Sequence, residues 1–230
     1  MRLRRTWVLL VGLLLVMGLT GCDDPKEPLD EKAVASKQEP EKKPAVHKPE
    51  TVVEKTLTEE KAIVAKIKEM GGHVEFDRNK AVVKVRLRDD VTDAGLEHLK
   101  GLTNLQDLYL GFSKVTDAGL EHLKGLTSLQ GLNLNSTQVT DAGLEHLKGL
   151  TNLQDLGFYR TKVTDAGLEH LKGLTNLQNL ALDGTKVTDA GLEHLEGMTK
   201  LQDLYLIDTN VTDEGVKNLQ QALPNCEIYR

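Results

Sequence analysis

Aromatic side chains are scarce in this sequence. They make up 3% of its 230 residues, against 39% for all hydrophobic residues. A hydrophobic core must therefore come from Leu and Val rather than from large rings. Such a core suits a thin, evenly layered interior.

The sequence also lacks an excess of positive charge. Its formal net charge is −6. Residues 1–21 carry three arginines and no acidic residue, so the remainder holds 26 basic against 35 acidic residues, or −9. Because phosphate binding requires a basic patch, we do not expect a nucleic-acid ligand.

Long hydrophobic runs are missing except near the N-terminus. Residues 7–19 form an apolar run of 13 residues after three arginines, whereas a membrane span needs about 20. The run ends in Leu19-Thr20-Gly21-Cys22, which resembles a bacterial lipobox. This resemblance implies cleavage before Cys22 and an acyl anchor, such as palmitate, on that residue. The alternatives are a transmembrane helix or an ordinary signal peptide.

The anchor predicts a location and the first two parts of the chain. Residues 1–21 are expected to be a lipoprotein signal peptide. Residues 22–55 are expected to be the lipidated Cys22 and a disordered tether of Lys, Glu and Pro, which has little to bury. Asp23 resembles the aspartate that retains enteric lipoproteins in the inner membrane. It favours the periplasmic side of that membrane within the cell envelope, over the outer membrane.

The dominant pattern is a repeat of 24 residues. Its first copy, V-T-D-A-G-L-E-H-L-K-G-L, begins at Val91. Four nearly unchanged copies and a weaker one follow, beginning at Val115, Val139, Val163, Val187 and Val211. A fixed period of this length with apolar residues at constant offsets predicts a stack of identical units.

Each copy resembles a leucine-rich repeat. The pattern Leu105-x-x-Leu108-x-Leu110-x-x-Ser113, followed by T-D-x-G-L, is similar to the variant in GALA-type and F-box-type proteins, and the match covers residues 82–230. The resemblance implies an α/β solenoid. Helices need about 10 Å of lateral room and strands about 4.8 Å, so we expect parallel strands on a concave side and short helices on a convex side.

One departure from the family concerns the position that usually holds Asn. It is occupied by hydroxyl residues, namely Ser113, Thr137, Thr161, Thr185 and Thr209. A hydroxyl can bond neighbouring backbone but offers fewer hydrogen bonds than an amide. We therefore expect a thinner hydrogen-bond ladder along the stack.

The course of one repeat follows from side-chain parity. Leu108 and Leu110 are expected to point inward from a strand, while Tyr109 points outward. Thr116 or Asp117 then caps a short helix. In the middle of this helix a glycine recurs in every copy, which suggests that a neighbouring turn packs too close for a Cβ.

Residues 56–90 are predicted to cap the stack with a helix and a hairpin. Thr56 and Glu59 have capping-box spacing, and Gly71-Gly72 supplies a stop. Alternating residues on both sides of the turn at residues 77–80 predict the hairpin. Residues 91–230 then form the solenoid, with five full repeats and a C-terminal capping repeat. In the last one, Cys226 is expected in the core and, with Cys22 lipidated, without a disulfide partner.

A column of histidines is the strongest candidate for chemistry. It consists of His98, His122, His146, His170 and His194. The histidines are expected one per helix and roughly 10 Å apart, whereas metal ligands converge at about 2 Å. We interpret the column as a solvated helix face. No phosphate loop or nucleophile motif is present, so we expect no enzyme activity, cofactor or metal.

The outward strand positions differ among repeats that are otherwise near duplicates. A position that varies in this way is not fixed by packing, and exposed aromatic and Arg side chains are typical of binding faces. The residues that we predict to contact a ligand are Tyr109, Phe112, Tyr159, Arg160 and Tyr205, with Asp107, Asp155 and Asp203 as the acidic complement to a basic ligand. Drift between duplicated repeats is the alternative explanation.

Together these features predict a lipid-anchored, non-catalytic scaffold that binds a protein or peptide through its concave face. A structural spacer or envelope surface element without a specific ligand is the alternative. An enzymatic or metal-binding role would depend on the histidine column. The expected partners are an unknown protein or peptide and the membrane, through Cys22.

Overall fold

The structure is a computed structural model, which describes residues 52–230, with side chains from Thr58 onward. The predicted signal peptide (residues 1–21), the lipidation site Cys22 and residues 23–51 of the predicted tether lie outside the described residues, so they stay predictions. Within the part that is described, no helix has both the length and the apolar character to cross a membrane.

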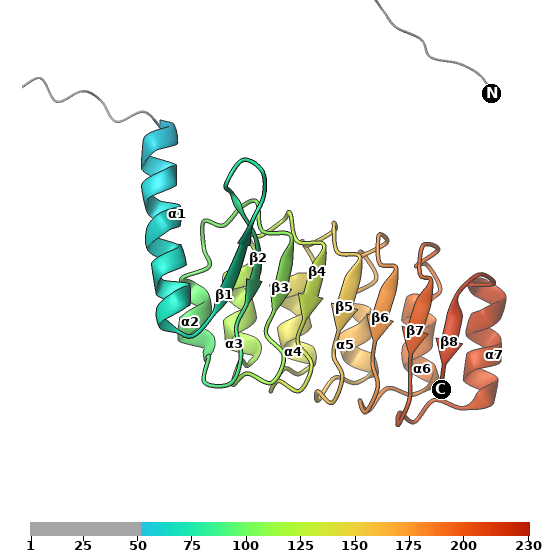
Figure 1. The fold of residues 1–230 in the computed structure, drawn as a ribbon. Helices are drawn as coiled ribbons and strands as arrows, with labels where there is room; N and C mark the ends of the chain where they lie inside the picture. The colour runs from blue at the N-terminus through green and yellow to red at the C-terminus, as the bar shows by residue number, and fades with distance from the viewer. Residues whose placement is uncertain (1–51) are drawn as a thin grey trace, which may run out of the picture. The chain divides into compact units, whose positions relative to one another are not determined.

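The described residues form one sheet with a row of mostly short helices along it, and the longer helix α1 stands at the N-terminal end (Figure 1). The eight strands are β1 (His73–Phe76), β2 (Val82–Arg86), β3 (Asp107–Tyr109), β4 (Gly131–Asn133), β5 (Asp155–Gly157), β6 (Asn179–Ala181), β7 (Asp203–Tyr205) and β8 (Glu227–Tyr229). The helices are α1 (Val52–Glu69), α2 (Asp93–Glu97), α3 (Asp117–Leu120), α4 (Asp141–Leu144), α5 (Asp165–Glu169), α6 (Asp189–Leu192) and α7 (Asp213–Ala222). Three short 3-10 turns, η1 (Glu121–Leu123), η2 (Glu145–Leu147) and η3 (Glu193–Leu195), extend α3, α4 and α6.

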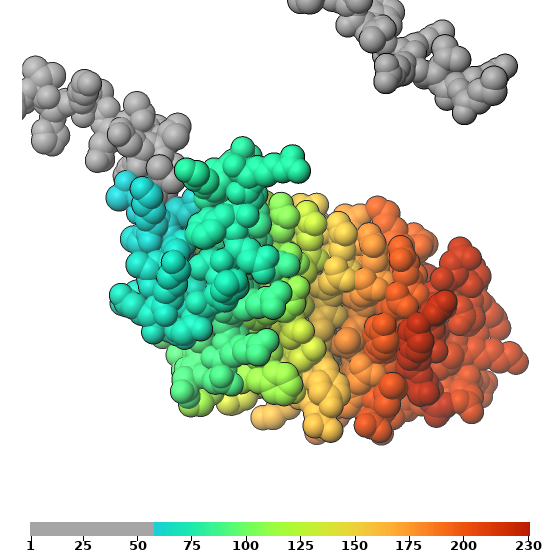
Figure 2. Space-filling view, viewed as in Figure 1, coloured from blue at the N-terminus to red at the C-terminus, as the bar shows by residue number. Residues whose placement is uncertain are grey.

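The strands follow one another in chain order across the sheet. β1 and β2 are antiparallel, and every later pair is parallel with the same register, so that Leu108 lies beside Leu132 and Leu132 beside Leu156. These three leucines are at most 3% exposed. In space-filling view the repeats form consecutive bands (Figure 2). The prediction of a layered leucine core is confirmed.

Two unusual core residues occupy leucine positions. Phe158 stands where the other repeats have leucine, and it is fully buried. Cys226 is 4% exposed and has a free thiol, which confirms its predicted place in the core. Burial raises the pKa of this thiol to about 11. The side chain therefore acts as a small apolar residue at neutral pH.

A carboxylate in each repeat is bonded to a threonine of the next, an arrangement that we call the Asp–Thr bridge. Asp117 Oδ1 accepts a hydrogen bond from the backbone N–H of Thr140 at 2.7 Å, and Oδ2 accepts one from its hydroxyl at 2.6 Å. The same two bonds join Asp93 to Thr116, Asp141 to Thr164, Asp165 to Thr188 and Asp189 to Thr212. At Asp189 the bonds from the Thr212 hydroxyl and backbone hold the carboxyl pKa below its usual value.

The bridge explains the glycine that recurs inside each short helix. A Cβ on Gly119 would collide with Asp93 Oδ1 and would lie 3.1 Å from Leu96 Cδ1. The equivalent clash occurs at Gly143, against Asp117. The prediction that a neighbouring turn leaves no room for a Cβ is thus confirmed, and the neighbouring group is the carboxylate.

The hydroxyl residues after each strand do not join neighbouring repeats. Thr137 Oγ1 donates to the carbonyl of Leu134 in its own repeat at 2.7 Å, and the same bond recurs at Thr161, Thr185 and Thr209. Ser113 Oγ is buried without a hydrogen-bond partner in the described region. The predicted ladder between repeats is therefore wrong at these positions, because the short side chain reaches only the carbonyl three residues earlier.

Helix α1 begins at Val52, four residues before the expected start at Thr56, which therefore lies inside the helix and does not cap it. Near the end of the helix Ile67 is fully buried, and Gly71 follows with a φ of +72°. The Glu60 carboxylate accepts a hydrogen bond from the N–H of Val82 at 2.7 Å, which ties the helix to β2. Helix and hairpin thus cover the first layer of the core.

A β-bulge interrupts the hairpin. The register between β1 and β2 shifts between Glu75 and Phe76. Val74 therefore points into the core and is 8% exposed, whereas Phe76, with the same parity, is 51% exposed. A strict alternation of inward and outward residues along β1 would have placed Phe76 in the core with Val74.

The corner after each strand has a left-handed backbone. The residues at this corner are Asp89, Phe112, Ser136, Arg160, Gly184 and Asp208, and their φ angles lie between 52° and 66°. A non-glycine residue in this conformation costs roughly 1–2 kcal/mol. The residues at this corner therefore differ among the repeats, although glycine would adopt the left-handed backbone at no such cost.

Candidate binding surface on the sheet

The outward sheet face consists of two rows of side chains that cross β2 to β8. The first row is Lys84, Asp107, Gly131, Asp155, Asn179, Asp203 and Glu227. The second row is Arg86, Tyr109, Asn133, Gly157, Ala181, Tyr205 and Tyr229. Large side chains stand at both ends of the second row, and small ones in its middle.

A hollow of about 430 Å³ lies in the middle of this face. Its floor includes Gly131, Gly157 and Ala181, while Tyr109 and Tyr205 border it. Asn135 Oδ1 lies 2.6 Å from the place that a Cβ on Gly157 would occupy, and both residues line the hollow. The hollow therefore exists because the central repeats carry small residues where the outer ones carry tyrosine.

Cationic side chains surround the tyrosine at the β2 end of the hollow. The Arg86 guanidinium lies 4.9 Å from the ring centroid of Tyr109, and Lys84 Nζ lies 5.9 Å from it. Lys84 also lies 3.6 Å from the Asp107 carboxylate. Glu75 lies 3.7 Å from Arg86 and 3.9 Å from Lys84. The positive charges at this end are thus already paired.

The β8 end of the face is aromatic and acidic. The rings of Tyr205 and Tyr229 are stacked, with centroids 4.8 Å apart and planes 9° from parallel. The Tyr229 hydroxyl donates a hydrogen bond to Glu227 Oε2 at 2.6 Å, and this bond raises the pKa of the phenol. Asp203 Oδ1 lies 3.3 Å from the same hydroxyl. Both tyrosines remain more than one third exposed, at 36% and 38%.

Four of the eight predicted contact residues line the hollow, namely Asp107, Tyr109, Asp155 and Tyr205. Asp203 belongs to the same face but stands beside Tyr229, outside the lining. The Asp155 carboxylate is bonded to the side-chain amide of Asn179 in the next repeat.

The other three predicted residues lie beyond the ends of their strands. Phe112 occupies a left-handed corner and is 67% exposed. The Arg160 guanidinium lies over the ring of Tyr159, 5.0 Å from its centroid. The structure therefore separates these three residues from the hollow that Tyr109 and Tyr205 border.

Four residues of this face were missed by reasoning from the sequence. They are Lys84 and Arg86 on β2, and Glu227 and Tyr229 on β8. The signal was present, because the cap strand keeps the leucine spacing, and Glu227 and Tyr229 follow Asp203 and Tyr205 by one repeat length of 24 residues. Extending the outward columns by one repeat at each end would have found all four.

The histidine column is less solvated than predicted. The side chains from His122 to His194 are partly buried, and the Nδ1 atoms of His122 and His146 are buried without a hydrogen-bond partner among residues 52–230. His98, in the first repeat, is exposed. The described residues contain no group of three or more His, Cys, Asp or Glu side chains that could hold a metal ion.

Leucine-rich repeats are recognised in the sequence itself. A family model described as "Leucine Rich repeat" matches residues 101–124 and 125–148. None of the curated proteins matches the chain.

Solved structures of repeat proteins resemble the fold. An internalin (inlF) from Listeria monocytogenes gives a TM-score of 0.50 at 24% identity, covering 63% of this chain and 38% of that one. Internalin C2 from the same organism gives a TM-score of 0.46 at 24% identity, and the match covers 72% of this chain and 91% of that one. A leucine-rich-repeat protein of Leptospira interrogans gives a TM-score of 0.44 at 22% identity, and the match covers 58% of this chain and 39% of that one.

The chain thus spans well under half the length of the first of these internalins. Three observations indicate the same fold. They are the match to the repeat model, the likeness to the first internalin, and the regular succession of strands and short helices. The predicted α/β leucine-rich-repeat solenoid is confirmed. Proteins built in this way are generally scaffolds for protein interaction.

Proposed function

We propose that this protein is a membrane-anchored, non-catalytic scaffold that binds a protein or peptide on its outward sheet face. The hollow between Tyr109 and Tyr205 carries the proposal. Aromatic side chains around a depression supply large contact areas with little loss of conformational entropy, and they dominate the energetics of many protein interfaces. A side chain of the ligand would enter the hollow and contact both tyrosines.

The charges on this face favour a basic ligand. Lys84 and Arg86 are engaged with Glu75 and Asp107. Among the described residues, the acidic groups toward β8 have only neutral hydrogen-bond partners: Glu227 accepts from Tyr229, and Asp155 from Asn179. A cationic side chain placed beside them would gain complementary electrostatics, which raises the association rate and fixes orientation.

The anchor places this scaffold at a membrane of the cell envelope. Its support is the lipobox resemblance that ends at Cys22, and two or more acyl chains hold a protein at a bilayer where a single chain does not. Asp23 favours the periplasmic side of the inner membrane.

Exchange of Cys22 should release the protein from the membrane. In cells that express the full chain, the wild type should sediment with membranes and incorporate an alkynyl palmitate probe. Cys22→Ser should do neither, because no thiol remains to be acylated. The matched control is Cys226→Ser, which removes the buried cysteine and should leave both properties unchanged. Probe incorporation into Cys22→Ser would contradict the assignment.

A photocrosslinker in the hollow should capture a defined partner. We expect p-benzoylphenylalanine at Asn133, in the hollow, to give discrete crosslinked proteins by mass spectrometry, whereas the same group at Lys148, on the helix side, gives none of them. Adding Tyr109→Ala and Tyr205→Ala should lower the yield about 30-fold, since loss of interface hot spots costs about 2 kcal/mol or more. Equal capture from both positions would refute the assignment of the face, and no capture from Asn133 would favour the spacer alternative.

A further inference from the structure

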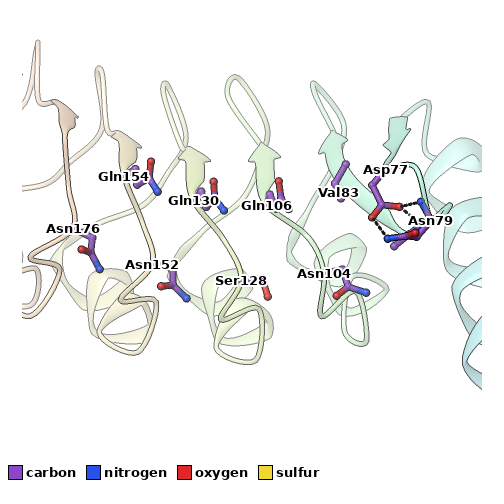
Figure 3. Close-up of a pocket in the computed structure, with 11 residues that line it drawn as sticks. Asp77, Asn79, Val83, Asn104, Gln106, Ser128, Gln130, Asn152, Gln154 and Asn176 are labelled. Atoms are coloured by element: carbon purple, nitrogen blue, oxygen red, sulfur yellow. Dashed lines mark hydrogen bonds between the residues drawn. The ribbon is translucent and has the colours of Figure 1, made fainter. Parts of the chain in front are cut away.

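A second groove, of about 600 Å³, runs along the edge of the sheet where the strands begin. Two rows of polar side chains line it (Figure 3). The row nearer the strands is Gln106, Gln130 and Gln154, and the row nearer the helices is Asn104, Ser128, Asn152 and Asn176. None of these residues belongs to the outward sheet face, so the groove is a separate site.

The glutamine row is held in register by the backbone. The N–H of Gln130 donates to the carbonyl of Gln106 at 2.7 Å, and the N–H of Gln154 donates to the carbonyl of Gln130 at 2.7 Å. Successive glutamines therefore stand about 4.8 Å apart, the spacing of parallel strands. Within residues 52–230, the side-chain amides of Gln106 and Gln130 make no hydrogen bond. Two donors and an acceptor on each amide are thus available to a ligand.

The asparagine row is oriented in advance. Asn152 Nδ2 donates to the carbonyl of Thr127 at 2.9 Å, and Asn176 Nδ2 donates to the carbonyl of Thr151 at 2.8 Å. These bonds fix the side-chain amides relative to the preceding repeat. The Asn152 oxygen stays available as an acceptor, whereas the Asn176 oxygen accepts a hydrogen bond from Lys200 at 2.7 Å.

The hairpin turn of the cap closes one end of the groove and places one carboxylate there. Asp77 is the charged residue of the lining, and its Oδ1 accepts hydrogen bonds from the N–H groups of Asn79 and Ala81, each at 2.8 Å. Figure 3 shows this bonded turn beside the amide rows. The groove therefore carries one negative charge at its hairpin end and is otherwise lined mainly by neutral polar side chains.

These properties exclude several classes of ligand. An anion would find no cationic side chain in the lining, and an apolar ligand would leave two rows of amides unpaired. An extended peptide presents side chains on one side every ~6.6 Å, which does not match rows spaced by ~4.8 Å. Away from Asp77, the neutral amide rows fit an uncharged, linear ligand with hydroxyl groups at the strand spacing.

We infer that the groove binds a strand of a neutral β-1,4-linked polysaccharide, with about one sugar ring for each repeat. The length of such a ring is close to the strand spacing. Alternate rings are turned over, but both edges of each ring carry hydroxyl or acetamido groups, which are donors and acceptors, as the glutamines require. The glutamine recurs at Gln178 and Gln202, although this position does not enter the core. The inference does not depend on the ligand of the outward sheet face.

Calorimetric titration of the full chain, purified in detergent, tests the inference. The probes are hexamers of β-1,4-linked N-acetylglucosamine and of β-1,4-linked glucose, with the coiled α-1,4-linked glucose hexamer for comparison. At least one β-linked hexamer should bind. Gln106→Ala combined with Gln130→Ala should weaken it roughly 10- to 100-fold, as expected when several neutral hydrogen bonds are lost.

Two control variants separate this site from the rest of the molecule. Lys148→Ala changes an exposed residue on the helix side, and Tyr109→Ala changes the outward sheet face, so both should bind as the wild type does. The thermal melting of the double glutamine variant should be unchanged, because neither side chain is in the core. Absence of binding by both β-linked hexamers, undiminished binding by the double variant, or equal binding of the α-linked hexamer would overturn the inference.

Discussion

Deletion of residues 125–136 is expected to abolish cooperative thermal unfolding, whereas deletion of residues 125–148 preserves it. The longer deletion removes one whole repeat and joins Lys124 to Gly149. Leu108 then pairs with Leu156, and Asp117 meets Thr164 in place of Thr140. Every contact between neighbours is replaced by an equivalent one, as expected for a stack of repeats.

The shorter deletion removes half a layer. It takes away β4 together with four buried leucines, Leu126, Leu129, Leu132 and Leu134, but keeps the following helix. Each leucine contributes roughly 1.5–3 kcal/mol when buried, so the loss is about 6–12 kcal/mol. That is comparable with the whole stability of an ordinary domain, about 5–15 kcal/mol. Strands β3 and β5 would also lose the strand between them.

Circular dichroism during heating distinguishes the two deletions. The 24-residue deletion should give one sharp transition below that of the parent chain, because one interface between repeats is lost. The 12-residue deletion should give no sharp transition, and its amides should exchange rapidly with deuterium. Equal melting curves for the two variants would contradict the layered architecture.

Gly143→Ala is expected to destabilise the protein by about 2–4 kcal/mol, although glycine to alanine inside a helix normally stabilises by about 1 kcal/mol. The new Cβ would collide with Asp117 Oδ1 and lie 3.2 Å from Asp117 Cα, which the backbone holds in place. The collision displaces the carboxylate from Thr140, and a hydrogen bond to a charged group is worth about 1.5–3 kcal/mol. Urea denaturation measures the change in unfolding free energy.

The matched control for this substitution is Gly149→Ala. A Cβ on Gly149 meets no atom within 4 Å, and its φ is not positive, so the unfolding free energy should change by less than about 0.5 kcal/mol. In a double-mutant cycle, Asp117→Ala combined with Gly143→Ala should cost less than the sum of the single changes. Strict additivity would show that the clash involves another group.

The repeat made most of the fold predictable from the sequence. Period, parity and the cap strand were sufficient to place Leu108, Leu156 and Cys226 in the core, and the recurring glycine indicated close packing. The partner of that glycine was not predictable. Periodicity shows which position is crowded but not which atoms crowd it, and the Asp–Thr bridge depends on the offset between neighbouring turns.

The binding surface was predictable only in part. Column analysis found Tyr109 and Tyr205, because variation among duplicates marks positions that packing leaves free. It also grouped Phe112 with them, although Phe112 occupies a left-handed corner outside the hollow. Comparison of the columns did not find the groove that Gln106, Gln130 and Gln154 line, because it considered only positions that differ among the repeats. A row of identical residues can be recognised as exposed only when the edge of the sheet is known.

The positions of the tyrosines give the outward sheet face an intrinsic spectroscopic signal. All four tyrosines of the chain, Tyr109, Tyr159, Tyr205 and Tyr229, are at outward strand positions or just beyond them, and the one tryptophan, Trp7, falls in the predicted signal peptide. Near-ultraviolet absorption and emission of the mature chain would therefore come mainly from this side of the solenoid. The stacked rings of Tyr205 and Tyr229 should give a coupled band in the near-ultraviolet circular dichroism spectrum. Binding of a ligand to the outward sheet face should therefore change this band, so that binding can be measured without a label.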